Sequence, residues 1–230
     1  MVKNILSASF LLYASSTTLF GLVIQNFESG SLNPGSSNLL LKTCDVNSPT
    51  SSLLAEGTYA INSNSANCHK LWANVAAQGG SNFMVVNGST AVGNVYQQTV
   101  TGVLPSVAST FSGYVTGLYR QAPAGLEFRV YDGVGTGGTL LGTIQFNTGI
   151  NPPPENPLWA KKSVNFTPIS STVTVQVLNV TTFADGNDFG LDTLDITPII
   201  GGAIINSTPE PSTMLLAGAM LLCMGIQRRK

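Results

Sequence analysis

The sequence predicts an all-β protein, built as a single antiparallel β-sandwich. In several segments apolar and polar residues alternate, as in Leu126–Tyr131 and Thr172–Val177, and a period of two places one set of side chains inward and the other in solvent. Charged residues make up only 9% of the 230 residues, whereas Ser, Thr, Asn and Gly are abundant. This composition is typical of exported β proteins and unlike that of helices rich in Glu and Lys. Clusters of Gly, Asn and Pro separate roughly ten such segments, and together these observations favour a jelly roll.

The expected strands follow one another along most of the chain. Besides the two alternating segments, they are Asn38–Lys42, Thr58–Asn62, Asn82–Asn87, Val95–Thr101, Thr110–Tyr119, Thr139–Phe146 and Asp188–Thr197. Asp132-Gly133 and Thr136-Gly137-Gly138 predict a tight connection between two of them, and the proline-rich segment Asn151–Pro157 predicts a stiff surface loop. Trp159 follows that loop and opens a further strand. Since no internal repeat is visible in the sequence, a propeller or a solenoid is not expected.

These strands fit one domain at 22–200, which a linker at 201–208 follows. The length suits a single hydrophobic core and is too short for two domains of comfortable size. Between Gly21 and Thr208, six basic residues stand against ten acidic ones, a net charge of −4. Because nucleic-acid binding needs a basic patch, no nucleic-acid partner is expected.

The N-terminal 21 residues have the pattern of a signal peptide. Met1–Asn4 supplies a short positive start, Ile5–Tyr13 is an apolar core of secretory length, and Ala14–Ser16 offers the small residues that a signal peptidase reads. The cleavage site stays open, because Leu19–Ile24 is also apolar and is either the end of the signal or the first strand of the domain.

The C-terminal segment 209–230 has three parts: Pro209-Glu210-Pro211, the uncharged stretch Thr213–Ile226, and a basic end formed by Arg228, Arg229 and Lys230. The 14 residues of the uncharged stretch are fewer than the roughly 20 that a membrane-spanning helix needs. The basic end favours the cytoplasmic side, so the domain would lie outside. The two prolines keep their tripeptide extended and accessible to a processing enzyme. The alternative is a plain C-terminal membrane anchor.

In this order the three parts resemble the PEP-CTERM sorting signal of bacterial envelope proteins. The resemblance implies that an exosortase recognises Pro209-Glu210-Pro211 and removes a tail with a short transmembrane segment at 213–226. It also implies an exported protein of the cell envelope, outer surface or extracellular matrix of a Gram-negative-type bacterium.

Two cysteines, Cys44 and Cys68, remain once Cys223 leaves with the tail. In an oxidising compartment such a pair is most simply a disulfide, and the alternative is two unpaired thiols. A zinc site is not expected, because His69 is the only histidine.

Four segments are similar to the galactose-binding-like jelly rolls found in PEP-CTERM proteins and in carbohydrate-binding modules. They are Val23–Gly30, Asn82–Gly88, Val95–Val100 and Gly186–Ile196. In those modules the first and last strands commonly share a structural calcium, which takes oxygen ligands. The resemblance assigns Glu28 and Asp192 as acidic ligands and Asp45 as a looser candidate, although Thr193 stands where a second acid is frequent. The alternative is that these acids are ordinary solvated residues at strand ends.

The residues around Asp192 also carry a local signal. Apolar side chains lie at Phe189 and Leu191 and then at Leu194 and Ile196, so the alternation changes phase at Asp192. A β-bulge at this point would aim the carboxylate inward.

Sugar binding needs exposed aromatic rings beside amides and carboxylates. The aromatic candidates are Trp72, Tyr119, Tyr131 and Trp159. Trp72 is the strongest of them because it lies in a polar, irregular stretch, and Tyr119 is a weaker one. Trp159 opens a strand where the resembling families place a buried aromatic, so a core position is expected for it.

No enzymatic activity is expected. The lone His69 has no recognisable nucleophile motif, and the acids Asp185, Asp188 and Asp192 form a local group that is more often structural than catalytic. The sequence therefore predicts an exported, exosortase-processed structural or interaction component of the extracellular polysaccharide matrix. The alternative is a carbohydrate-binding module that recognises an extracellular glycan.

Overall fold

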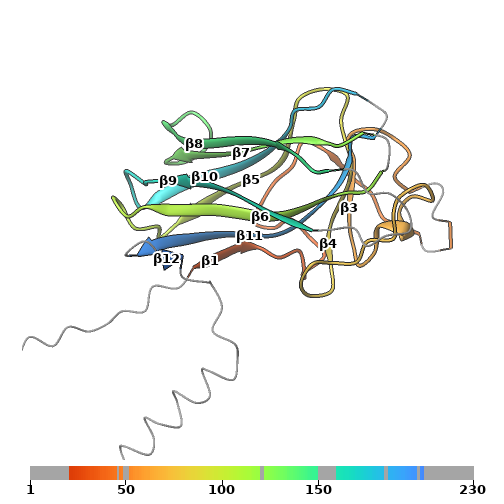
Figure 1. Ribbon diagram of the computed structural model, residues 1–230, viewed down its shortest axis with the longest axis horizontal. Coiled ribbons are helices and arrows are strands. Elements are labelled where there is room, and N and C mark those ends of the chain that lie inside the picture. Colours follow the sequence, from red (N-terminus) through yellow and green to blue (C-terminus); the bar gives the residue numbers. More distant parts are fainter. Residues whose placement is uncertain are drawn as a thin grey trace, which may run out of the picture.

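The computed structural model describes residues 21–45, 47–48, 52–119, 122–149, 159–183, 186–200 and 203–204. Two β-sheets pack face to face in this part of the chain (Figure 1), and its helical content is a single 3-10 turn, η1 (Ser65–Asn67). The all-β sandwich predicted from the sequence is confirmed. The signal peptide, the loop Asn151–Pro157 and the sorting tail lie outside the described residues. Within those ranges no helix is long and apolar enough to cross a membrane.

The larger sheet has the strand order β2-β3-β4-β11-β6-β9, and β1 and β12 each pair with β11. Its strands are β1 (Leu22–Gln25), β2 (Leu40–Leu41), β3 (Thr58–Asn62), β4 (Phe83–Asn87), β6 (Ser109–Gly117), β9 (Ala160–Phe166), β11 (Asp188–Ile200) and β12 (Ala203–Ile204). All pairs are antiparallel except β2 with β3, which is parallel. Strand β9 is the one that Trp159 was expected to open.

The smaller sheet has the order β5-β10-β7-β8 and is antiparallel throughout. Its strands are β5 (Gly93–Thr101), β10 (Thr172–Asn179), β7 (Gly125–Asp132) and β8 (Leu140–Asn147). Only β7 and β8 are consecutive in the sequence, so the chain crosses repeatedly between the two sheets, as in a jelly roll.

The main core lies between the sheets and follows the alternation read from the sequence. Leu126, Phe128 and Val130 of β7 are fully buried, as are the alternate valines of β10. Phe128 contacts Phe111 of the larger sheet, with ring centroids 5.1 Å apart, and Phe146 of its own sheet at 5.0 Å. Aromatic contacts of this kind add to the stabilisation from apolar burial.

A second apolar cluster covers the outer side of β3 and β4. It includes Phe83, Leu53, Trp72 and Cys68, all of them buried. Cys68 forms the predicted disulfide with Cys44. Because apolar layers lie on both of its sides, all five residues of β4 are buried. We call the described residues of 42–57 and 63–82, on either side of β3, the lid, because they cover the outer side of the larger sheet.

Candidate functional site

The outward face of the smaller sheet carries an ordered row of polar side chains. The strand register aligns Gln97 of β5 with Gln176 of β10, Gln176 with Arg129 of β7, and Arg129 with Thr143 of β8. Since side chains alternate across a strand, these four point away from the core that Phe128 and its neighbours fill. We refer to this row and the polar residues beside it as the polar face.

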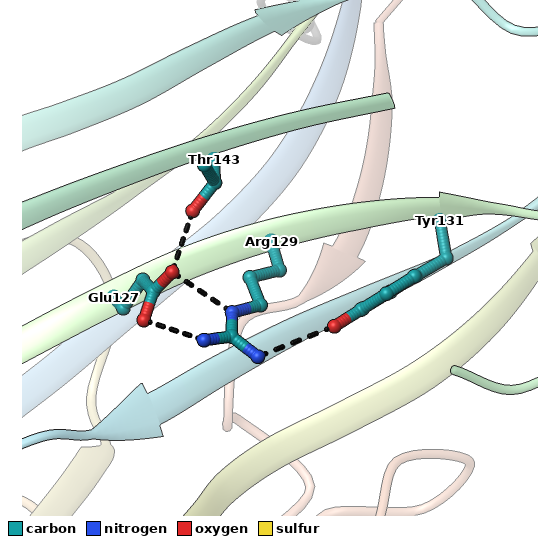
Figure 2. A network of polar contacts seen from close by, with 4 residues as sticks. All are labelled: Glu127, Arg129, Tyr131 and Thr143. Atoms are coloured by element: carbon teal, nitrogen blue, oxygen red, sulfur yellow. Dashed lines mark hydrogen bonds and ion pairs between the residues drawn. The ribbon is translucent and has the colours of Figure 1, made fainter. Parts of the chain in front are cut away.

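Four residues of the polar face form one network, which Figure 2 shows from close by. Arg129 donates from Nε to Oε1 of Glu127 and from a terminal nitrogen to Oε2, both at 2.8 Å. Its other terminal nitrogen donates to the Tyr131 hydroxyl at 3.4 Å. Thr143 Oγ1 donates to Oε1 of Glu127 at 2.7 Å. The pair of parallel bonds between guanidinium and carboxylate fixes both groups in one plane.

The network keeps two ionised groups at a partly exposed surface. The hydrogen bonds from Arg129 lower the pKa of Glu127, and Thr143 adds to the effect. The bonds to Glu127 and Tyr131 raise the pKa of Arg129. The side chains of Arg129 and Glu127 are 33% and 14% exposed. A ligand would therefore meet charged groups whose orientation is already set, which lowers the entropic cost of binding.

The polar face continues to the edge strand β5. Gln176 Nε2 donates to Gln97 Oε1 at 3.1 Å, and the hydroxyls of Thr99 and Thr174 lie 3.0 Å apart. On β10 the polar groups are covered, because Thr174 is fully buried and Gln176 is only 8% exposed. The amide, hydroxyl, carboxylate, guanidinium and phenol groups that remain partly open to solvent lie on β5, β7 and β8. Such a surface can pair with many hydroxyl groups of one ligand.

The sequence already placed several of these residues in solvent, because Glu127, Arg129 and Tyr131 alternate with apolar neighbours. The register that brings Gln97 and Thr143 beside them was not predictable from the sequence.

The two aromatic residues that the sequence favoured lie instead near one small pocket at the end of the larger sheet. This cavity of about 190 Å³ is lined by Tyr119 and His69, together with Asn87 and Asp188. Trp72 is only 6% exposed. Its Nε1 donates to Asp188 Oδ2 at 2.9 Å, and its ring lies 5.0 Å from that of His69. The expectation of an exposed Trp72 ring was wrong, because the second apolar cluster buries the indole, whereas Tyr119 is half-buried at the pocket wall.

Trp159 has the structural position expected from the sequence. Its ring packs edge-to-face on Phe83, with centroids 5.3 Å apart, and its Nε1 donates to the carbonyl of Ala76 at 3.0 Å. These contacts tie the start of β9 to the lid over the larger sheet.

The predicted calcium ligands Glu28 and Asp192 hold the same loop, residues 78–82. Glu28 accepts hydrogen bonds from the backbone amides of Ser81 and Asn82 at 2.9–3.1 Å. Asp192 Oδ2 accepts from the amide of Gln78 at 2.9 Å. Asp192 is fully buried, and burial raises its pKa while the backbone amides oppose this effect.

The predicted bulge at Asp192 is confirmed. The register between β11 and β6 shifts between Asp192 and Asp195, and Thr193 has a φ of 42°. The shift lets Leu191 and Leu194 both lie in the main core although they are three residues apart, a spacing that places side chains on opposite faces of a regular strand.

The described residues fit a calcium ion only in part. Asp45 lies on a different loop, where its Oδ1 accepts from the amide of Asn47 at 2.8 Å. Within the part of the chain that the structure describes, no three His, Cys, Asp or Glu side chains are grouped to hold a metal. Calcium takes six to eight oxygen ligands, and loop 78–82 turns amide N–H groups toward Glu28 and Asp192. Calcium stays a prediction from the sequence.

Comparisons with known proteins find similar solved structures but no family. No family model and no curated protein matches the chain. Over 86% of its length it is similar to the tandem CBM22 domain of Paenibacillus barcinonensis Xyn10C, of which it spans 49%, at 16% identity and a TM-score of 0.46. Over 79% of its length it is similar to TmCBM61, solved in complex with β-1,4-galactotriose, of which it spans 99% (14% identity, TM-score 0.47).

The enzymatically active domain of tailspike protein 4 from bacteriophage CBA120 is also similar, over 79% of this chain and 22% of the tailspike (10% identity, TM-score 0.48). The similar structures thus include both binding modules and an enzyme domain. Likenesses at this level of identity do not carry a ligand or an activity over to this chain.

Proposed function

We propose that this protein is an exported, non-catalytic module that binds an extracellular glycan on the polar face of its smaller sheet. The observation that supports this most is the network of Glu127, Arg129, Tyr131 and Thr143, which presents fixed donors and acceptors on a partly exposed surface. Glycans need this chemistry, because each sugar unit offers several hydroxyls to polar side chains and an apolar C–H face to an aromatic ring such as Tyr131.

The shape of the polar face favours a chain of sugar units over a single one. Four neighbouring strands at about 4.8 Å spacing give a row of about 14 Å from Gln97 to Thr143. The residues of that row extend from one edge strand to the other rather than enclosing a cavity. An oligosaccharide segment lying across the strands would contact the exposed side chains of β5, β7 and β8 and pass over the buried Gln176 of β10. Its affinity would come from several modest hydrogen bonds.

The export route is a further part of the proposal. The disulfide between Cys44 and Cys68 is consistent with an oxidising, extracytoplasmic compartment. We infer delivery by the signal peptide and by the sorting tail, with cleavage at Pro209-Glu210-Pro211 by an exosortase-type protease. The mass and location of the mature protein in cells with and without that protease test this step, since an unchanged mass would contradict cleavage.

Affinity electrophoresis tests the glycan proposal. The protein is run through gels that contain xylan, β-1,4-galactan, hydroxyethyl cellulose or the matrix polysaccharide of the producing cells. We expect at least one of them to retard the wild-type protein and Arg129→Met to remove the retardation. Arg129→Lys keeps the charge but loses the planar fork, so it should restore little of it.

Lys42→Met is the matched control, because Lys42 is an exposed cation outside the polar face. Retardation that survives Arg129→Met, or falls equally in both variants, would contradict binding at this face. Absence of retardation across the whole panel would instead favour the structural matrix component that the sequence predicted.

A further inference from the structure

One end of the sandwich is almost without charge. It comprises the β5–β6 loop (102–108), the β7–β8 hairpin (133–139), the β9–β10 loop (167–171) and the outer ends of β1, β11 and β12, which Figure 1 shows together on the left. None of these residues is Asp, Glu, Lys or Arg. We call this region the exit end, because β1 begins here and β12 ends here.

Main-chain hydrogen bonds join the loops of the exit end to one another. The amide of Ser106 donates to the carbonyl of Pro168 at 2.8 Å, and the amide of Gly133 donates to the carbonyl of Thr172 at 2.8 Å. The single acid at its border, Asp132, accepts from the amides of Ile169 and Ser170 at 3.1 and 2.9 Å. The loops of the exit end therefore form one connected surface. The carboxylate of Asp132 at its border is hydrogen-bonded to backbone amides.

Apolar side chains project from this surface. Val134 at the tip of the β7–β8 hairpin is 81% exposed, and Ile169 in the β9–β10 loop is 64% exposed. Leu22 and Leu104, at 43% and 38%, border an open apolar pocket of about 180 Å³. Large exposed apolar residues on an uncharged surface indicate a contact with another apolar phase.

The opposite end differs in charge, although it also exposes leucines. Leu54 is 58% exposed there, and it lies near Glu56, His69 and Lys70 in the lid segment. The absence of charge, rather than apolar exposure alone, distinguishes the exit end within the described residues.

The short segment between β12 and the C-terminal apolar stretch keeps the exit end close to any bilayer that holds that stretch. Strand β12 ends at Ile204, and the uncharged stretch Thr213–Ile226 begins nine positions further on, after the eight residues 205–212. Fully extended, the nine steps from Ile204 to Thr213 span at most about 32 Å. While the apolar stretch is inserted in a bilayer, the exit end must stay within this distance of the membrane surface.

We propose that the exit end rests on the lipid bilayer that holds the C-terminal apolar stretch, with Val134 and Ile169 inserted at the level of the headgroups. The inference rests on the proposed sorting tail. Shallow insertion of apolar side chains stabilises such an orientation, and because the exit end has no cation, it needs no anionic lipid. With the exit end on the bilayer, the polar face of the smaller sheet stays in solvent while the protein awaits processing.

Fluorescence quenching in vesicles tests this orientation with the full-length chain. Val134→Trp and Ile169→Trp each add one fluorophore at an exposed tip, and Leu54→Trp at the opposite end is the matched control. Each variant is reconstituted into phosphatidylcholine vesicles with and without brominated acyl chains, and the emission of the parent protein is subtracted. An unchanged Tm for each variant confirms that the fold is intact.

We expect brominated lipid to quench about half or more of the added emission from Val134→Trp and Ile169→Trp, because shallow insertion places the indoles near the acyl chains. The added emission of Leu54→Trp should be unaffected. If the chain floats with the vesicles but neither tip is quenched, the proposed orientation is wrong, whereas membrane insertion of the C-terminal tail is still supported. Quenching of Leu54→Trp to the same degree also overturns the inference. A chain that does not float with vesicles at all overturns both it and the membrane insertion of the tail.

Discussion

Breaking the disulfide bond between Cys44 and Cys68 should lower the free energy of unfolding. The expected loss follows from the number of residues in the loop that the bond closes. The two residues are 24 positions apart. On the chain-entropy model, breaking a crosslink that closes a loop of this length raises the conformational entropy of the unfolded state. The free energy of unfolding then falls by about 3.5 kcal/mol at 25 °C. For a domain of this size 1 kcal/mol corresponds to about 2–4 °C in Tm, so the expected loss is about 7–14 °C. The bond also joins the two parts of the lid, 42–57 and 63–82, and Cys68 is fully buried in the second apolar cluster.

Circular dichroism melts of the oxidised and the reduced protein measure this loss. Cys223→Ser in both samples removes the third thiol, so that no other pairing competes. Comparing two redox forms of one sequence leaves the volume of Cys68 in place, which Cys68→Ala would not. A fall in Tm of less than about 2 °C, or about 0.5–1 kcal/mol, would contradict this expectation, because the lid would then hold its position without the crosslink.

Three further predictions concern single side chains. Trp72→Phe should lower the free energy of unfolding by about 1–3 kcal/mol, since it removes the buried 2.9 Å hydrogen bond to Asp188. Glycan retardation should stay unchanged. Loss of retardation with an unchanged Tm would indicate that Trp72 contacts the glycan. Glu127 has a lowered pKa in the folded state, so its contribution to stability is present above its unfolded pKa and is lost as the pH falls through the folded one. The Tm of the wild type should therefore fall more steeply on acidification than that of Glu127→Gln, and parallel curves would contradict the role of the ion pair. For calcium, the sequence predicts a higher Tm in calcium than in EDTA; equal values, with a lower Tm for Asp192→Ala, would assign Asp192 to its amide contacts with loop 78–82 alone.

The alternation of side chains predicted much of the fold but not the layer outside it. Strands β7 and β10 have a clear period of two, and the structure buries the residues that the pattern placed inward. The solvent half of the pattern is wrong for β10, where Thr174 and Gln176 are buried as well. Strand β3 has the bounds that the sequence predicts, Thr58–Asn62. Strand β4 has no alternation because the lid covers its outer side, and that contact depends on segments that are distant in the sequence.

The candidate site was predictable only where the signal was local. The change of phase at Asp192 predicted the bulge, which is a property of one strand. The burial of Trp72 was not predictable, since its hydrogen-bond partner Asp188 lies 116 positions away and the neighbours Cys68 and His69 gave the stretch a polar character. The polar face likewise depends on the register of four strands, which hydrophobic patterning alone does not define.

An NMR titration shows where on the protein a glycan binds. Oligosaccharide fragments of the most strongly retarding polysaccharide are added to the isotopically labelled protein, and the amide and side-chain shifts are followed. If the glycan binds on the polar face, the largest changes lie at Gln97, Arg129 and Tyr131. Changes confined to the pocket at His69 and Tyr119 would place the glycan at the end of the larger sheet and contradict binding on the polar face.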